Sequence, residues 1–435
     1  MKLFSFGKVI LLSAFLFQAR DGFSENQNET GFVPIFDGQS LNGWKLMDRN
    51  GLGYAVTNGI IFCARGGGGN LFTEKEYEDF ILRFEFRLEA GSNNGIGIRA
   101  PYEGDAAYLG MEIQVLDDTT KKYGTLRPEQ HHGSIYDVVA AKVGFQKPVG
   151  EWNVEEITAQ GRHIKVVLNG TTITDANLND VADSEILQRH PGLFRERGHI
   201  GFLGHNDYVE YRNLRVKELP VSHRDNIPPS GFVALFNGKD LTGWKGLGAT
   251  PPKRAKMSAA ELAAAQKKED ENMRSHWKVE DGVLVFDGQG KNLCSEKDFS
   301  DFELMADWKI EPKGDSGIYL RGCPQVQIWD YTDTGGKKDH SVGSGGLHNN
   351  LKNPSTPLQR ADHAIGQWNH FRILMTGEKV HVFLNNELVV TNTTLENSWE
   401  RDKPVYPTGP IELQNHHDPL YFKNIYVREL LPKTN

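Results

Sequence analysis

Two short segments of the sequence alternate polar and apolar side chains in a way that could place several hydrogen-bonding groups on one surface. In the first segment Glu112 and Gln114 alternate with apolar residues, and in the second Gln325, Gln327 and Trp329 do the same. Successive side chains of a β-strand point to opposite faces, so each polar set would share one face while its apolar neighbours enter a core. Amide and carboxylate groups beside an aromatic ring can bind the hydroxyls and the apolar C–H face of a sugar. The pattern therefore predicts a carbohydrate-binding sheet face.

Further hydrogen-bonding side chains fall on the same predicted face when the alternation is carried into neighbouring segments. Arginine supplies a planar fork of donors that suits paired acceptors. The alternative, a solvated sheet face, would more often carry Lys, Thr and Ser than paired Gln and Arg. The predicted substrate-binding residues are Arg99, Gln114, Arg321, Gln325, Gln327, Trp329 and Gln414, together with His348 from a Gly-rich loop.

Carboxylates and histidines add acid–base or metal-binding capacity to this face. His205 and His416 recur in matching segments, and we expect them to be bases or ligands of a divalent metal ion. Asp117 and Asp330 end their predicted strands, where an aspartate can equally form a turn. The candidate catalytic residues are Glu112, Asp117, Asp330 and Glu412.

The segments that carry these residues occur twice in the chain. Residues 31–45 return as residues 231–245, and residues 198–213 match residues 409–424 without a gap. A period of about 200 residues is far longer than the roughly 20–50 residues of a solenoid repeat, so it indicates a duplicated domain. The predicted parts are a first domain at 31–219, a polar linker at 220–230 and a second domain at 231–431.

Within each copy the hydrophobic pattern is that of short strands. Every second residue from Phe80 to Leu88 is apolar, and the residues between them are mostly charged. This period of two is typical of a half-buried antiparallel strand, so we predict an all-β fold of two tandem sandwiches. Residues 252–274 depart from it, being rich in Ala, Lys and Glu. Ser258 and Glu261 have the spacing of a capping box, which predicts an exposed helix inserted in the second copy.

The first 24 residues are predicted to be a signal peptide and leader. Lys2 and Lys8 precede the apolar run at 9–17, and residues 17–19 offer a weak cleavage site. The apolar run is too short to span a bilayer, and no later run approaches the roughly 20 residues needed. We therefore expect a periplasmic or secreted protein without a membrane span, and without a lipid anchor because no cysteine lies near the cleavage site.

The overall composition limits the classes of partner and cofactor that the protein is expected to bind. The formal net charge is −8, which does not favour nucleic acid or an anionic membrane as a partner. Three cysteines form neither a disulfide framework nor a zinc motif. A carbohydrate remains the predicted partner, and a divalent metal the only predicted cofactor.

Several motifs of the second copy resemble one known family. They are FNGKDLTGW at 236–244, GDSGIYLRG at 314–322, PQVQIWD at 324–330 and GSGGL at 343–347. These segments are similar to the 3-keto-disaccharide hydrolase domain, and the resemblance covers nearly all of both copies. It implies a concanavalin-A-like (lectin/glucanase) jelly-roll sandwich, export to the periplasm of a Bacteroidetes-type bacterium, and action on glycosides oxidised at C3 of the sugar.

A ketone at C3 would make the C2 proton acidic and allow the glycosidic oxygen on C1 to leave by elimination, after which water can add. This chemistry needs a base near C2, donors for the enolate oxygen and an acid for the leaving group. Arg99, Arg321 and His205 or His416 could stabilise the enolate, and a divalent metal could replace them. An ordinary glycosidase would need two carboxylates flanking C1, and the predicted face has no close pair of the E-x-D-x-x-E kind.

Two other functions remain open at this point. A lectin-like pair of modules would bind glycans without cleaving them, and would need stacking aromatic rings but no carboxylates. A purely structural protein does not account for the recurrent Arg and Gln positions. The first copy has Glu112 and Leu203 where the second has Gln325 and Gln414, so the copies can divide catalysis and binding in either order.

Overall fold

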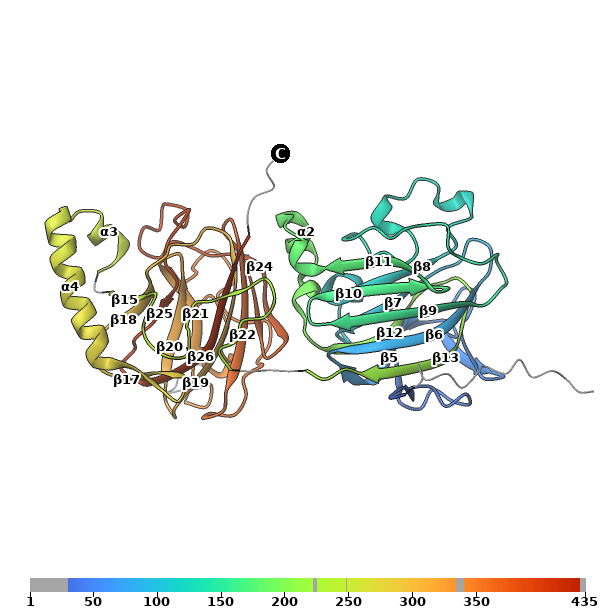
Figure 1. The fold of residues 1–435 in the computed structure, drawn as a ribbon, viewed down its shortest axis with the longest axis horizontal. Coiled ribbons are helices and arrows are strands. Elements are labelled where there is room, and N and C mark those ends of the chain that lie inside the picture. Colours follow the sequence, from blue (N-terminus) through green and yellow to red (C-terminus); the bar gives the residue numbers. More distant parts are fainter. Residues whose placement is uncertain (1–29, 222–224, 248, 334–339, 431–435) are drawn as a thin grey trace, which may run out of the picture.

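The computed structural model describes residues 30–221, 225–247, 249–333 and 340–430. Their strands form four sheets, two in each copy, and the two copies stand side by side along the molecule (Figure 1). The fold is all-β, with two tandem jelly-roll sandwiches, as predicted from the strand periodicity. The predicted leader at 1–24 lies outside the described residues.

In the first copy an eight-stranded sheet faces a five-stranded sheet. The larger sheet contains, in spatial order, β11 (Thr171–Asn177), β10 (His163–Leu168), β9 (Asn153–Gln160), β6 (Phe80–Leu88), β13 (Val209–Glu218), β4 (Ile60–Cys63) and β3 (Tyr54–Thr57), with β1 (Val33–Pro34) paired to β13. The smaller sheet contains β2 (Trp44–Asn50), β5 (Gly68–Tyr77), β12 (Gly198–His205), β7 (Asn93–Ala100) and β8 (Met111–Leu116). The helices of this copy are α1 (Ala106–Leu109) and α2 (Ser184–Arg189), with 3-10 turns at Lys121–Tyr123, Pro128–Gln130, Leu178–Asp180 and Pro191–Phe194.

The second copy repeats this arrangement strand for strand. Its larger sheet contains β16 (Trp277–Glu280), β17 (Val283–Asp287), β26 (Pro419–Glu429), β19 (Phe302–Ile310), β22 (Asn369–Thr376), β23 (Lys379–Leu384) and β24 (Glu387–Thr394), with β14 (Val233–Ala234) paired to β26. Its smaller sheet contains β15 (Trp244–Leu247), β18 (Asn292–Ser295), β25 (Glu412–Leu413), β20 (Asp315–Leu320) and β21 (Cys323–Trp329). The helices of this copy are α3 (Pro251–Arg254) and α4 (Ala259–His276), with a 3-10 turn at His340–Val342.

Apolar residues that alternate along the strands fill the space between each pair of sheets. The alternate residues from Phe80 to Leu88 are all at most 5% exposed, and Ile96 and Ile98 of the smaller sheet join the same core. Trp308 and Phe371 belong to the separate core of the second copy. Burying a large apolar side chain contributes about 2–3 kcal/mol, so these rows hold each pair of sheets together.

The predicted insert of the second copy is confirmed as helical. Ser258 and Glu261 make the reciprocal hydrogen bonds of a capping box at the start of α4. Most of α4 is exposed, and it contacts the edge strand β15 (Figure 1). The side chain of Gln266 donates to the carbonyl of Gly246 at 2.9 Å, and Asp270 accepts from the Gly246 N–H at 3.0 Å. The insert therefore covers a sheet edge that the first copy leaves without a helix of this kind.

A buried ion-pair network joins the two sandwiches. Glu303 of β19 accepts hydrogen bonds from Arg372 and Arg428, and burial alone would raise its pKa, but the arginines lower it to about 2. The same two arginines reach the first copy, where Arg372 donates to the carbonyl of Phe194 at 3.0 Å and Arg428 to that of Asn179 at 2.8 Å. In Figure 1 α2 lies where the sandwiches meet. Both copies thus share one buried charged contact.

The predicted linker is described at 220–221 and 225–230. The N–H of Asn226 donates to the side chain of Asn424 at 2.6 Å, and the carbonyl of Ser230 accepts from Asn179 at 2.7 Å. These bonds attach the described linker residues to both sandwiches.

Candidate functional site

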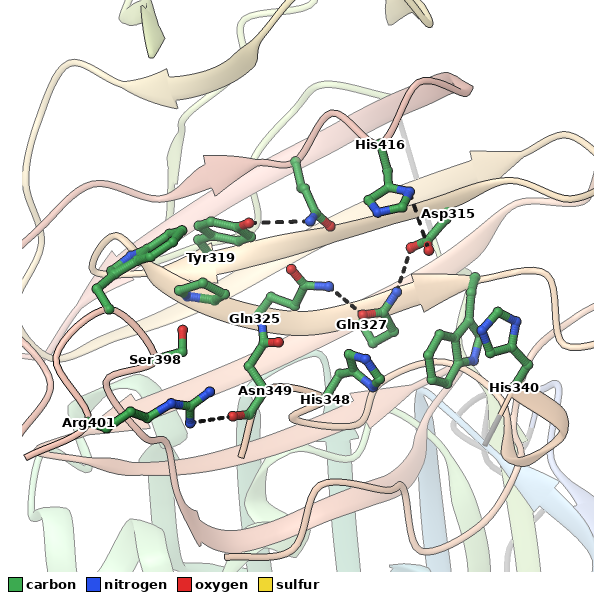
Figure 2. Close-up of a pocket in the computed structure, with 14 residues that line it drawn as sticks. Asp315, Tyr319, Gln325, Gln327, His340, His348, Asn349, Ser398, Arg401 and His416 are labelled. Atoms are coloured by element: carbon green, nitrogen blue, oxygen red, sulfur yellow. Dashed lines mark hydrogen bonds and ion pairs between the residues drawn. The ribbon is translucent and has the colours of Figure 1, made fainter. Parts of the chain in front are cut away.

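One pocket opens on the five-stranded sheet of the second copy and has a volume of about 500 Å³. Cavities of this size hold small ligands such as sugars. The side chains come from β20 and β21, from the segment after β25 and from loops that follow β21 and β24 (Figure 2). The residues lining this second-copy pocket are Asp315, Tyr319, Pro324, Gln325, Gln327, Trp329, His340, His348, Asn349, Ser398, Trp399, Arg401, Gln414 and His416.

Asp315 and His416 form a carboxylate–imidazole pair in the second-copy pocket. Asp315 Oδ2 lies 3.5 Å from His416 Nδ1, and Asp315 Oδ1 accepts a hydrogen bond of 2.7 Å from Gln327 Nε2. Gln327 in turn accepts from Gln325, so a chain of amides holds one carboxylate oxygen while the other faces the imidazole (Figure 2). A carboxylate and an imidazole in one cavity can take a proton from a bound ligand and return it.

Three polar atoms of this pocket are buried and have no hydrogen-bond partner among the described residues. They are Gln325 Oε1, Gln414 Oε1 and Ser398 Oγ. The amide nitrogen of Gln414 donates to the hydroxyl of Tyr319 at 3.2 Å, which leaves its oxygen as the free acceptor. A buried polar atom without a partner costs about 1–3 kcal/mol, a cost that the hydroxyl groups of a ligand would remove.

Aromatic rings supply the apolar part of the second-copy pocket. Trp329 stacks on His340 with ring centroids 4.4 Å apart, and His348 meets the same indole edge-on at 5.1 Å. The ring centroids of Tyr319 and Trp399 are 6.2 Å apart. Both indole N–H groups donate to backbone carbonyls, which fixes the rings in place. Rings beside amides are the combination that a sugar requires.

The first copy has a pocket of about 500 Å³ on the matching sheet. Its carboxylate–imidazole pair is Glu112 and His205, with 3.7 Å between Glu112 Oε1 and His205 Nε2. Burial raises the pKa of Glu112, which is 3% exposed, and Glu112 raises the pKa of the half-exposed His205. The residues lining this first-copy pocket are Asn70, Asn93, Asp105, Ala106, Ala107, Tyr108, Glu112, Gln114, Leu116, Tyr123, Leu126, Gln130, Tyr136, Leu203, Gly204 and His205.

The structure therefore gathers nine of the predicted site residues into two pockets. Those in the second-copy pocket are Gln325, Gln327, Trp329, His348, Gln414 and His416, and those in the first-copy pocket are Glu112, Gln114 and His205. The other five lie elsewhere.

Arg99 and Arg321 differ from their predicted placement, since neither is among the residues lining these pockets. Both have positive φ angles, 49° and 52°, which breaks the alternation of the strand at that residue. Arg99 donates to the carbonyls of Glu78 and Gly161, and Arg321 pairs with Asp301. Their place on the predicted sugar-binding face is thus corrected: these guanidinium groups hold neighbouring turns together.

Asp117 and Asp330 also lie outside the residues lining the pockets. Asp117 accepts hydrogen bonds from Thr119 and from the N–H of Gly91, and Asp330 makes the equivalent bonds in the second copy. Burial alone would raise their pKa values, but these hydrogen bonds lower both. Asp117 and Asp330 therefore make the hydrogen bonds of turn-forming aspartates, which was the alternative to a catalytic role.

Glu412 is buried in β25 and does not line the second-copy pocket. Its Oε1 has no hydrogen-bond partner among the described residues. Burial raises its pKa to about 7, although Arg254 and Lys245 act in the opposite direction. Because Arg254 belongs to α3, Glu412 lies close to the helical insert.

The donor atoms around the two predicted metal-binding histidines are few. Among the described parts of the chain, no group of three or more His, Cys, Asp or Glu side chains is placed to hold a metal ion. His205 and His416 each have one carboxylate nearby, Glu112 and Asp315 respectively. Zinc sites in proteins usually have at least three protein ligands, so these pairs do not fit a resident ion of that kind.

Sequence reasoning missed several residues of the second-copy pocket. Asp315 could have been predicted from the repeat, because the first copy has Asn93 at the matching position. The second copy therefore has a carboxylate where the first has an amide. Asn349, Trp399 and Arg401 come from irregular loops, in which period-two alternation gives no direction. Arg401 donates to the carbonyl of Asn349 at 2.6 Å, which ties two of these loops together.

The sequence profile of one family, described as the 3-keto-alpha-glucoside-1,2-lyase-like domain, matches residues 31–217 and 231–428. The chain belongs to this family. Each match of the 3-keto-alpha-glucoside-1,2-lyase-like domain spans the strands of one sandwich, so the pocket of each copy lies within a family domain.

Several known proteins are similar to part of this chain. A 3-keto-disaccharide hydrolase of Bacteroides thetaiotaomicron is 28% identical over 236 residues, covering 43% of this chain and 79% of that protein. A candidate glycosyl hydrolase of Parabacteroides distasonis, solved by crystallography, is 27% identical, covering 43% of this chain and 99% of its own, with a TM-score of 0.39. A second from the same organism is 21% identical, covering 46% and 99%, with a TM-score of 0.39.

Membership of the 3-keto-alpha-glucoside-1,2-lyase-like family, together with the named hydrolase relative, assigns the chain to a family of glycosidase-like, carbohydrate-active proteins. Within the described residues, no helix is both long enough and apolar enough to cross a membrane.

Proposed function

We propose that this protein cleaves the glycosidic bond of 3-keto-glycosides, 3-keto-disaccharides included, in the second-copy pocket. One observation carries the proposal: Asp315, His416 and buried amide oxygens without partners converge on one cavity of about 500 Å³. The family description and the name of the hydrolase relative support the oxidised sugar as the substrate class.

In the proposed reaction Asp315 removes the proton from C2 of the oxidised sugar. The electrons of the C2–H bond form the enolate of the C3 ketone. The enolate then collapses: a C1=C2 double bond forms, the C1–O bond breaks, and the aglycone oxygen takes a proton from His416. Water adds across the C1=C2 bond, with its oxygen on C1 and a proton on C2, and gives the free 3-keto sugar. General acid–base catalysis of this kind contributes typically 10²–10⁴-fold.

The contact between Asp315 and His416 allows both side chains to return to their starting protonation states. After elimination Asp315 is protonated and His416 is neutral, which is the reverse of the starting state. The 3.5 Å between Asp315 Oδ2 and His416 Nδ1 allows the proton to pass back between them. The hydrogen bond from Gln327 keeps the carboxylate oriented throughout.

The remaining groups bind the sugar and its developing charge. Gln325 and Gln414 offer free amide oxygens to sugar hydroxyls. Burial and the nearby Glu412 raise the pKa of Tyr319 to about 12, so it stays a phenol and can donate to the enolate oxygen. The ring of Trp399 near Tyr319 offers an apolar surface for the C–H face of the sugar.

Export is part of the proposal. The charged start and short apolar run of residues 1–24 support cleavage of a signal peptide and release into the periplasm or medium. Fractionation of cells that express the full chain, with N-terminal sequencing of the product, is expected to find a mature chain that starts after the apolar run. A full-length cytoplasmic product would contradict it.

The test of the activity compares a 4-nitrophenyl glucoside oxidised at C3 with its unoxidised parent. We expect release of nitrophenol from the oxidised substrate alone, and deuterium incorporation at C2 when the reaction runs in D₂O. Proton NMR then separates the enone of an elimination from the hydrated sugar. A parallel reaction with a chelator tests the predicted metal. Binding of both glucosides without cleavage of either would contradict the proposal and leave the lectin-like alternative.

A further inference from the structure

The first-copy pocket contains polar atoms that the proposed cleavage does not use. Glu112 Oε1 is buried and makes no hydrogen bond to a described residue, with His205 Nε2 as its ion-pair partner at 3.7 Å, and Asn93 Oδ1 on a neighbouring strand also makes no hydrogen bond among the described residues. Both residues line the cavity. Buried polar atoms nearly always make hydrogen bonds, so two that make none in one cavity mark a place where a ligand's hydroxyl groups can bind.

The rest of this cavity is more apolar than its counterpart in the second copy. Leu203 stands where the second copy has Gln414, and Leu116 stands where it has Trp329. Leu126 lines the cavity from the loop after β8. Leu116 pairs with Asn93 across two neighbouring strands, and Leu203 packs on Gly97, which pairs with Glu112. The cavity therefore offers aliphatic surface beside its hydrogen-bonding groups.

The group assigned to the enolate oxygen in the second copy, Tyr319, and one of the amides assigned to sugar hydroxyls, Gln414, have no equivalent at the matching positions here. Gly97 occupies the position that corresponds to Tyr319, and Leu203 the position that corresponds to Gln414. The side-chain oxygen of Gln114 is already bonded to the N–H of Val115 at 3.0 Å. The first-copy pocket thus keeps an acid and a histidine but lacks a phenol and an amide at the positions of Tyr319 and Gln414, and its own tyrosines and amides stand at other positions of the sequence.

We infer that the first-copy pocket is a second, non-catalytic glycoside site, which binds a sugar that carries an apolar or aromatic aglycone. The sugar hydroxyls bind Glu112 and Asn93, and the aglycone packs against Leu116, Leu126 and Leu203. The inference rests on the proposed function for the sugar half of the ligand. It assigns binding to the first copy and cleavage to the second.

Calorimetric titration of the full chain with phenyl β-glucoside and with glucose tests the inference. We expect two sites for phenyl β-glucoside. Glu112→Gln, which installs the amide found at position 325, is expected to weaken both ligands at one site by about tenfold, because a hydrogen bond to a charged group becomes a neutral one. Leu126→Gln is expected to weaken phenyl β-glucoside at that site by about tenfold and glucose by less than twofold.

Glu151→Gln removes an exposed carboxylate of the first copy and serves as the matched control. Thermal unfolding of each variant shows whether it is folded. A single site, or two sites that respond to neither Glu112→Gln nor Leu126→Gln, would overturn the inference. Loss of 3-keto-glucoside cleavage in the folded Glu112→Gln chain would also overturn it, since catalysis would then lie in the first copy. The proposed function itself fails by a different measurement, the absence of cleavage by the unsubstituted chain.

Discussion

The two pockets lie on matching five-stranded sheets, but the position that carries the carboxylate in one copy carries an amide in the other. Both have a histidine at the matching position, His205 at the end of β12 and His416 in the segment that follows β25. In the first copy the carboxylate is Glu112 on β8, while the matching residue of the second copy is Gln325. In the second copy the carboxylate is instead Asp315 on β20, where the first copy has Asn93. A duplicated fold can therefore keep its imidazole and move the neighbouring acid to another strand.

The exchange changes the surroundings of the acid. Asp315 accepts a hydrogen bond from an amide and its side chain is 26% exposed, whereas the side chain of Glu112 is 4% exposed and its Oε1 makes no hydrogen bond among the described residues. Desolvation disfavours the charged form of a carboxyl group, so burial raises the pKa of Glu112. An oriented, partly solvated carboxylate suits proton abstraction, and a buried one suits hydrogen bonding to a neutral ligand.

The largest expected effect comes from removing the acid that distinguishes the second copy. Asp315→Asn installs the amide of the first copy, and we expect kcat for a 3-keto-glucoside to fall by about 10³-fold because the base is lost. Steady-state kinetics measures it. Asp281→Asn, in an exposed turn of the same copy, is the matched control. Full activity of Asp315→Asn would break the assignment of catalysis to the second copy.

A second prediction concerns how much the buried ion-pair network between the two copies contributes to the free energy of unfolding. Glu303→Gln leaves Arg372 and Arg428 buried without their carboxylate, and we expect the free energy of unfolding to fall by about 4 kcal/mol. The pKa of Glu303 is about 2, below its usual value of 4.5, so its stabilisation is present above pH 4.5 and disappears as the pH falls toward 2. Urea unfolding at several pH values measures both effects. Exposed Glu218→Gln is the control, and equal losses in the two variants would show that the network contributes nothing.

The third prediction concerns a titration that the first copy cannot have, because Gly201 replaces Glu412 there. The folded pKa of Glu412 is about 7, above its usual 4.5, so the folded state binds more protons between these values. Stability should therefore fall as the pH rises from 4.5 to 7, by about 3 kcal/mol in total, and stay level above. Glu412→Gln should remove this slope in denaturant titrations. A slope that persists in the variant would mean that another group titrates.

The smallest expected effect is a change in the pKa of His205. Glu112 raises the pKa of His205, so Glu112→Gln should lower it. The pH dependence of the imidazole resonances in NMR spectra measures the change, and His163 on β10 serves as an internal reference. An unchanged pKa of His205 would show that the two side chains do not interact in solution, and would weaken the comparison of the two pairs.

Local patterns were sufficient to predict the architecture. The alternation from Phe80 to Leu88 predicted strand β6 and its buried face, and the spacing of Ser258 and Glu261 predicted the start of α4. The same alternation predicted eight of the nine pocket residues, all except His348 of a loop, and Gln325, Gln327 and Trp329 stay in regular strand conformation. Where the backbone is regular, the direction of a side chain follows from its position.

The prediction failed where the backbone leaves the regular strand. Arg99 and Arg321 have positive φ angles, and that change in conformation turns each side chain away from the expected face. Asp117 and Asp330 lie just past strand ends, where hydrogen bonds to the turn decide their role. Their positions were known from the sequence, but their partners were not.

The sequence by itself determined that the chain is a duplicated β protein with polar residues on matching sheet faces, since strand periodicity and repeat spacing are local properties. Only the tertiary structure decided which groups meet. It brought Asn349, Trp399 and Arg401 from separate loops to the second-copy pocket, and it set Asp315 beside His416 across about 100 residues of sequence. Contacts between distant segments depend on how sheets and loops pack in three dimensions, and no local pattern of residues records them.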